Sequence, residues 1–264
     1  RSRDGGTAEE SRIISTSSST VDSANLASTP AFHMAPSVTI VCTSAHTLQG
    51  HPTGLWLEEC AAPYYIFQKA GFNVTIASPL GGPVPLDAAS LAEGFLTDAA
   101  KKFLLDAHAM GALSHTVKLA DVDMSANQAV FFCGGHGTCV AGDFVDDPSV
   151  KAAVEGMHSS GKVVAAVCHG PMCLTQCMQP DGKTPLVKGL KVAGFTDSEE
   201  AAVALTGKVP FLLESKLKEL GALYEKADDW NSKVCVDGKL VTGQNPQSSE
   251  ACATAVVGLL AGAA

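Results

Sequence analysis

The sequence lacks long uninterrupted apolar segments and has little positive charge. No run of about 18 consecutive apolar residues occurs, so we expect no transmembrane helix. Lys and Arg number 18 against 27 Asp and Glu, which gives a formal net charge of −9. Nucleic acid is an unsuitable partner for such a chain, because its phosphates favour a basic surface. We therefore expect a protein that handles small molecules or other proteins, with no nucleic-acid or membrane partner.

Closely spaced cysteine pairs are also missing, although the chain has nine cysteines. The odd number, the chain length and the irregular spacing predict reduced thiols and no disulfide framework. Cys42 and Cys133 lie in apolar runs and are expected to act as small buried hydrophobic residues. Cys168, Cys173 and Cys177 are spaced by five and four residues, which does not suit a zinc site. We expect no metal.

Residues 1–34 differ in composition from the rest of the chain. Twelve of them are Ser or Thr and they show no sustained apolar period, so the segment cannot bury enough surface to offset its ordering entropy. Its acidic residues do not suit a transit peptide, and His33-Met34 resembles a cloning junction. We predict a disordered extension or tag over 1–34 and one domain over 35–264. The expected location is cytoplasmic, or organellar if residues 1–34 are a native transit peptide.

From Ser37 onward, short buried strands alternate with helical segments. Strands are predicted at 37–44, 73–78, 129–133, 162–167, 190–195 and 221–227, and a hairpin at 233–243. Helices are predicted at 55–70, with Thr53 as its cap, within 90–110, at 148–160, and from about 246 to the C-terminus. This alternation predicts an α/β fold with a mainly parallel sheet and helices on both faces.

The strongest local signal is VVAAVCHGPMCL (163–174), in which a buried strand runs directly into Cys-His-Gly-Pro. Cys168 would then lie at the carboxyl end of a strand, where open α/β sheets bind their ligands. We predict that a helix begins directly after it and that the N-terminal amides of this helix favour the thiolate. Free backbone amides at such a turn could hold an oxyanion. A buried structural thiol is the alternative.

Glycines follow another strand in FFCGGHGTC (131–139). They permit positive φ and a close approach of the backbone to a ligand. Their spacing fits neither a dinucleotide fingerprint nor a P-loop. Beside Cys168, the amides of Gly134 and Gly135 are interpreted as an oxyanion cradle, with a plain tight turn as the alternative.

Two carboxylates lie on the first predicted helix, in TGLWLEECAAP (53–63). Glu58 and Glu59 are adjacent, so their side chains point about 100° apart and we expect at most one to face a site. Most helical glutamates are solvated surface residues, and the sequence alone leaves a function for either one open.

Together these motifs resemble the DJ-1/PfpI superfamily, and most closely its heat-shock-chaperone branch, the glutathione-independent glyoxalases. The resembling stretches span about residues 37–262 and are TGLWLEE, AGFNVTIASPLGGPVPLD, CGGHGT, VVAAVCHGP, GFTDSEE and KLVTGQNPQSS. The resemblance implies a flavodoxin-like sandwich and a homodimer.

The resemblance also implies a catalytic triad. Cys168 corresponds to the family nucleophile and His169 to the histidine that follows it. The acidic partner of that histidine falls in GFTDSEE, where Glu200 matches best and Glu199 is the fallback one residue away.

Further residues of the implied site surround this triad. The glutamate that contacts the cysteine sulfur corresponds to Glu59. The oxyanion amides would belong to Gly135 and His169, with His136 beside the pocket. Because a second anion would oppose thiolate formation, we expect Glu59 to be protonated and to donate to the sulfur.

The implied activity is that of a lyase, a glyoxalase III type D-lactate dehydratase. It converts methylglyoxal and related 2-oxoaldehydes to 2-hydroxy acids through a hemithioacetal on Cys168, without a metal or organic cofactor. Three alternatives remain open: a stress-inducible holdase chaperone, a redox sensor in which Cys168 is oxidised, and a hydrolase or protease. Protein deglycase activity is a related possibility.

Overall fold

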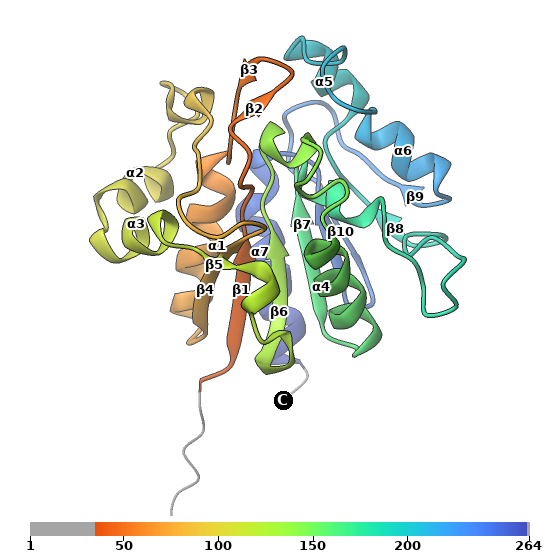
Figure 1. Ribbon diagram of the computed structural model, residues 1–264, viewed down its shortest axis with the longest axis horizontal. Coiled ribbons are helices and arrows are strands. Elements are labelled where there is room, and N and C mark those ends of the chain that lie inside the picture. The colour runs from red at the N-terminus through yellow and green to blue at the C-terminus, as the bar shows by residue number, and fades with distance from the viewer. Residues whose placement is uncertain (1–34, 263–264) are drawn as a thin grey trace, which may run out of the picture. The chain divides into compact units, whose positions relative to one another are not determined.

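A mainly parallel, seven-stranded sheet forms the centre of the domain. The computed structural model describes residues 35–262, and the predicted extension over 1–34 lies outside the described residues (Figure 1). In spatial order the strands are β10 (Val234–Asp237), β11 (Leu240–Gly243), β7 (Val163–Val167), β6 (Asn127–Phe132), β1 (Ser37–Val41), β4 (Asn73–Ser78) and β5 (Val117–Lys118). All neighbours are parallel except the β10–β11 hairpin.

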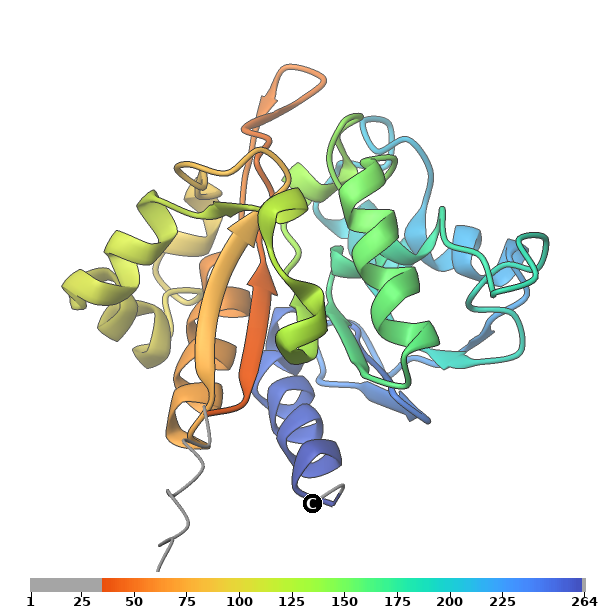
Figure 2. The same ribbon diagram turned by 60° about the horizontal axis from the view of Figure 1, so that its bottom comes forward.

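Helices cover both faces of this sheet, as predicted. On one face α1 (Leu57–Lys69) and α7 (Ser249–Ala261) pack against each other and against the strands, and α4 (Pro148–Ser159) covers β6 and β7 on the other (Figures 1 and 2). Because both faces are covered, every residue of β7 is buried. No helix within residues 35–262 is long and apolar enough to cross a membrane.

Smaller elements lie outside the main sheet. They are the hairpin of β2 (Thr47–Leu48) and β3 (His51–Pro52), the parallel pair of β8 (Lys191–Val192) and β9 (Leu223–Tyr224), and the helices α2 (Asp98–Leu105), α3 (Ala107–Ser114), α5 (Asp197–Ala202) and α6 (Leu213–Glu219). The strands predicted at 190–195 and 221–227 are thus reduced to two residues each and pair outside the main sheet.

Local capping explains where the helices begin. The Asp147 side chain accepts hydrogen bonds from the amides of Ser149 and Val150, and Pro148 opens α4 at the predicted position. The cap predicted for α1 is wrong: Trp56 precedes that helix without a side-chain cap, while the Thr53 hydroxyl donates to Asp87. The predicted 90–110 helix is two helices, α2 and α3, because the Asp106 carboxylate caps the start of the second.

The segment after Cys168 also differs from the prediction. It is a 3₁₀-helix over Gly170–Leu174, closed by bonds such as that from the Met172 amide to the His169 carbonyl, 3.0 Å. A helix this short presents a much weaker N-terminal dipole than the predicted α-helix. Stabilisation of a Cys168 thiolate must therefore come from other groups.

Candidate active site

Cys168 occupies a sharp turn directly after β7. Its φ is 60°, in the left-handed region that non-glycine residues rarely adopt. The turn is held on both sides: the Cys168 amide donates to the Gly243 carbonyl at 3.0 Å, and the Phe195 amide donates to the Cys168 carbonyl at 2.8 Å. Strain of this kind is found where surrounding contacts force a side chain into a functional position.

His169 links this thiol to a carboxylate. Its Nδ1 lies 3.6 Å from the Cys168 sulfur, and its Nε2 lies 2.7 Å from Oε2 of Glu200. The imidazole is fully buried, with its ring centroid 4.1 Å from that of His136 and 4.4 Å from that of Phe195. Packing on both sides fixes the ring between the thiol and the carboxylate.

His136 shares the same carboxylate through Oε1 of Glu200, at 2.9 Å. Burial by itself raises the pKa of Glu200, but the two histidines outweigh it and hold this pKa well below its usual range. An ionised carboxylate only accepts hydrogen bonds, so both Nε2 atoms must carry the protons. In neutral His169 the remaining nitrogen, Nδ1, is then an acceptor facing the thiol.

The charge state of His169 suits proton transfer. Burial, and then the nearby His136, lower the pKa of His169, while Glu200 raises it. The net shift is downward, so His169 is neutral near pH 7 and its Nδ1 can accept the proton of Cys168.

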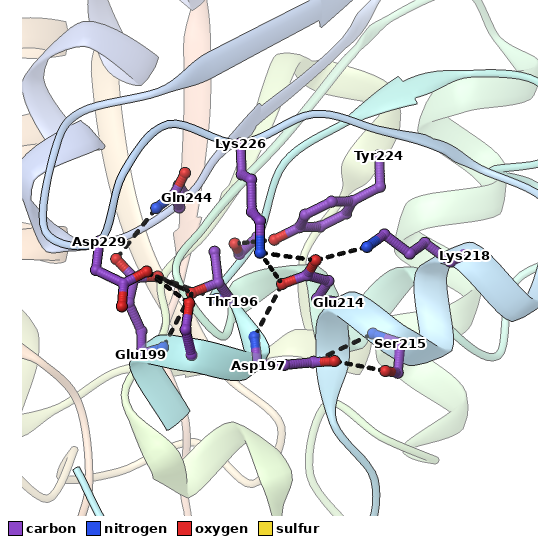
Figure 3. A network of polar contacts seen from close by, with 12 residues as sticks. Thr196, Asp197, Glu199, Glu214, Ser215, Lys218, Tyr224, Lys226, Asp229 and Gln244 are labelled. Carbon is purple, nitrogen blue, oxygen red and sulfur yellow. Dashed lines mark hydrogen bonds and ion pairs between the residues drawn. The ribbon is translucent and has the colours of Figure 1, made fainter. Parts of the chain in front are cut away.

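Glu199, the fallback for the triad acid, points into a different network. Its Oε2 accepts from the Thr196 amide and hydroxyl, both at 3.0 Å, which forms a capping box at the start of α5 (Figure 3). Its Oε1 accepts from the Trp230 amide at 2.9 Å and from Gln244 and Asn245. Glu199 therefore anchors the loop that carries Trp230, and Glu200 alone of the two contacts the histidines.

Glu59 lies beneath the sulfur of Cys168 and is fully buried. Its Oε2 accepts from the Gly134 amide at 2.7 Å, whereas its Oε1 has no hydrogen-bond partner within the described residues. Burial raises the pKa of Glu59 to about 8, against lowering contributions from the Gly134 amide and from Cys168. A carboxyl group with this pKa keeps its proton at pH 7, and the free oxygen can carry it towards the sulfur.

Glu58 points elsewhere. Its carboxyl accepts from the Thr97 hydroxyl at the start of α2, and burial raises its pKa to about 7. Of the two adjacent glutamates, Glu59 alone interacts with Cys168.

The thiol itself is only 3% exposed. Burial, followed by the charge of Glu59, raises the pKa of Cys168, and the backbone N–H of Gly135 lowers it. When Glu59 keeps its proton, it lowers the pKa of Cys168 instead of raising it. A protonated carboxyl group donates a hydrogen bond to the thiolate, whereas an ionised carboxylate repels it. The pKa of Cys168 thus depends on the protonation of Glu59.

The two glycines after β6 have separate tasks. Gly135 has a φ of 92° and directs its amide to the Cys168 sulfur. Its role as an oxyanion donor stays a prediction. The prediction that Gly134 also belongs to the oxyanion cradle is wrong, because its amide is occupied by Glu59. An assignment of the His169 amide to this cradle stays a prediction.

A cavity of about 70 Å³ opens over the thiol. It is mainly apolar and is lined by Trp56, Phe95, Gly135, His136, Cys168, His169, Phe195, Val203, Trp230, Pro246 and Gln247. The sequence did not point to Phe95 or Val203, which lie outside any recognisable motif. Pro246 and Gln247 could have been found, because they follow β11, the neighbour of β7, at the same edge of the sheet.

The nitrogen and oxygen atoms of His136, His169 and Glu200 that could bind a metal ion lie within 4.8 Å of one another. Both Nε2 atoms already donate hydrogen bonds to Glu200. These hydrogen bonds account for the short distances as a proton-transfer network.

The sequence profile of the DJ-1/PfpI family matches residues 54–259. The chain belongs to the DJ-1/PfpI family. This DJ-1/PfpI member is 30% identical to Glyoxalase 3 of Candida albicans, over 79% of this chain and 90% of that relative. It is 31% identical to the glutathione-independent glyoxalase HSP31 of Saccharomyces cerevisiae, over 77% and 88% of the two chains.

Solved structures agree with this assignment. Glyoxalase III of Candida albicans superposes with a TM-score of 0.77 and 28% identity, over 85% of this chain and 97% of that one. Rapid Encystment Protein 24 KDa (REP24) of Francisella tularensis reaches 0.80 and 34%, over 85% and 99%. The predicted flavodoxin-like fold of this family is thereby confirmed.

Substitutions of Glu59 test whether its proton stabilises the Cys168 thiolate. Glu59→Gln retains a donor that cannot ionise, whereas Glu59→Leu removes the donor and leaves the sulfur buried. We expect a thiol pKa near or below the wild-type value in Glu59→Gln and at least one unit higher in Glu59→Leu. The pH dependence of alkylation by iodoacetamide measures this pKa, with Cys168→Ala as the background. A thiol pKa that rises as far in Glu59→Gln as in Glu59→Leu would refute this role.

A second pair of variants separates Glu200 from Glu199. Glu200→Gln removes the negative charge that accepts hydrogen bonds from both Nε2–H groups. We therefore expect kcat to fall by about 10²–10⁴-fold with the fold retained. Glu199→Gln leaves its network short of an acceptor, so the main effect should be a lower melting temperature. Equal loss of kcat in both variants, at unchanged stability, would contradict the assignment.

Proposed function

We propose that this protein is a glutathione-independent glyoxalase that converts methylglyoxal and related 2-oxoaldehydes to 2-hydroxy acids, with Cys168 as the nucleophile. The observation that carries the proposal is the series of contacts from the Cys168 sulfur through His169 to Glu200. Cys168 and His169 also line a small apolar cavity. The relatives named as glyoxalases support the same reaction.

The size of the cavity favours a small substrate. The cavity of about 70 Å³ is small and has mainly apolar walls. A site of this kind favours a short 2-oxoaldehyde over a peptide segment, which needs a longer open cleft, so it disfavours a protease. Apolar walls of Trp56, Phe95 and Trp230 would keep bulk water away from the reacting carbon.

The reaction begins with transfer of the Cys168 proton to Nδ1 of His169. The thiolate attacks the aldehyde carbon, a C–S bond forms, and the developing oxyanion faces the Gly135 amide. This oxygen takes up a proton to give a hemithioacetal. The first step requires a neutral His169, which the burial of its ring favours.

Proton transfer within the hemithioacetal is the internal redox step. His169 removes the proton from the former aldehyde carbon, and the neighbouring carbonyl oxygen takes up a proton to give an enediol. The neighbouring carbon then gains a proton while the hydroxyl on the former aldehyde carbon loses one, which forms the carbonyl of the thioester. The aldehyde carbon is thereby oxidised to a thioester while the ketone is reduced to an alcohol. Water then cleaves the C–S bond and releases lactate and the free thiol. Glu200 stabilises each imidazolium that forms.

The overall reaction adds one water to methylglyoxal and gives lactate. It consumes no external oxidant or reductant and requires no metal or organic cofactor. We assign the proposed activity to the lyases, because the reverse reaction removes water from lactate.

Two further features are part of the proposal. All nine cysteines are free and buried, which suits a reducing compartment such as the cytoplasm. The homodimer implied by the family resemblance, and the extent of the domain over 35–264, stay predictions.

Turnover of methylglyoxal without glutathione tests the proposed function. We expect wild-type protein to release lactate, and Cys168→Ala to lose at least about 10³-fold in kcat/KM because the nucleophile is gone. Cys173→Ala is a matched control, since Cys173 is a buried thiol outside the cavity, and should retain turnover. Fully reduced wild type without turnover would overturn the proposal and favour the chaperone or redox-sensor alternative.

A further inference from the structure

Three buried cysteines outside the catalytic machinery converge on one point. Cys42 follows β1, Cys60 lies in α1, and Cys133 follows β6. Their sulfur atoms all lie within 4.8 Å of one another, and each side chain is fully buried. We refer to these three residues as the thiol cluster.

The fold brings the thiol cluster together from segments far apart in sequence. β1 and β6 are parallel neighbours, and the Cys133 amide donates to the Val41 carbonyl at 2.9 Å, so Cys42 and Cys133 leave the sheet side by side. Helix α1 crosses above them and contributes Cys60. The Cys133 sulfur also donates to the Glu59 carbonyl at 3.1 Å, which fixes the position of the helix.

No other three cysteines within the described residues converge in this way. Cys252, for example, is equally buried but donates to the Ala166 carbonyl and belongs to no such group. Three sulfurs that each lie about 2.3 Å from one metal ion, in a trigonal plane, are about 4 Å from one another. The sulfur atoms of the thiol cluster lie within 4.8 Å of one another, which is compatible with this geometry.

We propose that the thiol cluster of Cys42, Cys60 and Cys133 binds one monovalent copper ion, Cu(I), through three sulfur ligands. Soft thiolate ligands favour Cu(I) over harder cations. Structural zinc requires four ligands in a tetrahedron, and the group within the described residues offers three sulfurs and no fourth donor.

Formation of the Cu–S bonds displaces the protons of the thiols that become thiolate ligands, so copper binding releases protons and changes no oxidation state.

The site has a structural consequence. A copper ion there would tie α1 to the ends of β1 and β6, next to Glu59 and Gly134 but without contact to the cavity. Since the ion binds the folded chain, its presence should raise the thermal stability.

Anaerobic titration with Cu(I) against the chelator bathocuproine disulfonate tests the site. The full chain with Cys168→Ala is used, so that the cavity thiol cannot contribute, and copper is supplied both to the folded protein and during refolding. We expect one copper per chain to be retained, three sulfur ligands by X-ray absorption and a higher melting temperature. Cys60→Ser should weaken copper binding by at least about tenfold, and Cys252→Ser should bind as the parent does.

Circular dichroism confirms that each variant is folded. If Cys60→Ser does not fold, Cys133→Ala takes its place with the same expected loss. Failure to retain copper by either loading route would overturn the proposal. Equal retention by the cluster variants, or preferential binding of Zn(II) with four ligands, would overturn it as well.

Discussion

The burial of two acidic groups side by side, the Cys168 thiol and the Glu59 carboxyl, is the constraint on which the rest of the site depends. Two anions in a low-dielectric interior repel each other strongly, and the described structure places no cation beside Glu59. One proton must therefore remain on the pair, and the two groups titrate as a unit. Since the Gly134 amide holds Oε2 of Glu59, that proton belongs on Oε1, towards the sulfur.

A second carboxylate nearby has the opposite environment. Glu200 accepts hydrogen bonds from His136 and His169, so its pKa is low, whereas that of Glu59 is raised by burial. Environments that separate the pKa values of two carboxyl groups are how one fold assigns acid and base roles. In the mechanism that we propose, the proton of Glu59 supports the thiolate, and the charge of Glu200 supports the imidazolium.

Much of this arrangement could be predicted from the sequence, because a buried strand that ends in Cys-His-Gly-Pro leaves few alternatives for the position of Cys168. The choice between Glu200 and Glu199 could not be made, since adjacent helical residues differ only in direction and the Thr196 capping box determines which way each points. The role of Gly134 could not be predicted for a similar reason. The consecutive amides of Gly134 and Gly135 point to different partners, and the buried Glu59 accepts from the Gly134 amide. Phe95 and Trp230 reach the cavity from loops, whose paths depend on tertiary contacts such as the bond from the Trp230 amide to Glu199.

The protonation of Glu59 can be observed directly by infrared spectroscopy. We expect a carbonyl stretching band of a protonated carboxylic acid at pH 7 that is absent from Glu59→Gln and that disappears in the wild type as the pH rises through about 8. Difference spectra against Glu59→Gln isolate this band from those of other buried carboxyl groups. If the wild type lacks the band at pH 7, Glu59 is ionised beside the sulfur. In that case the thiol must hold the proton, and Glu59 could not stabilise the Cys168 thiolate as a hydrogen-bond donor.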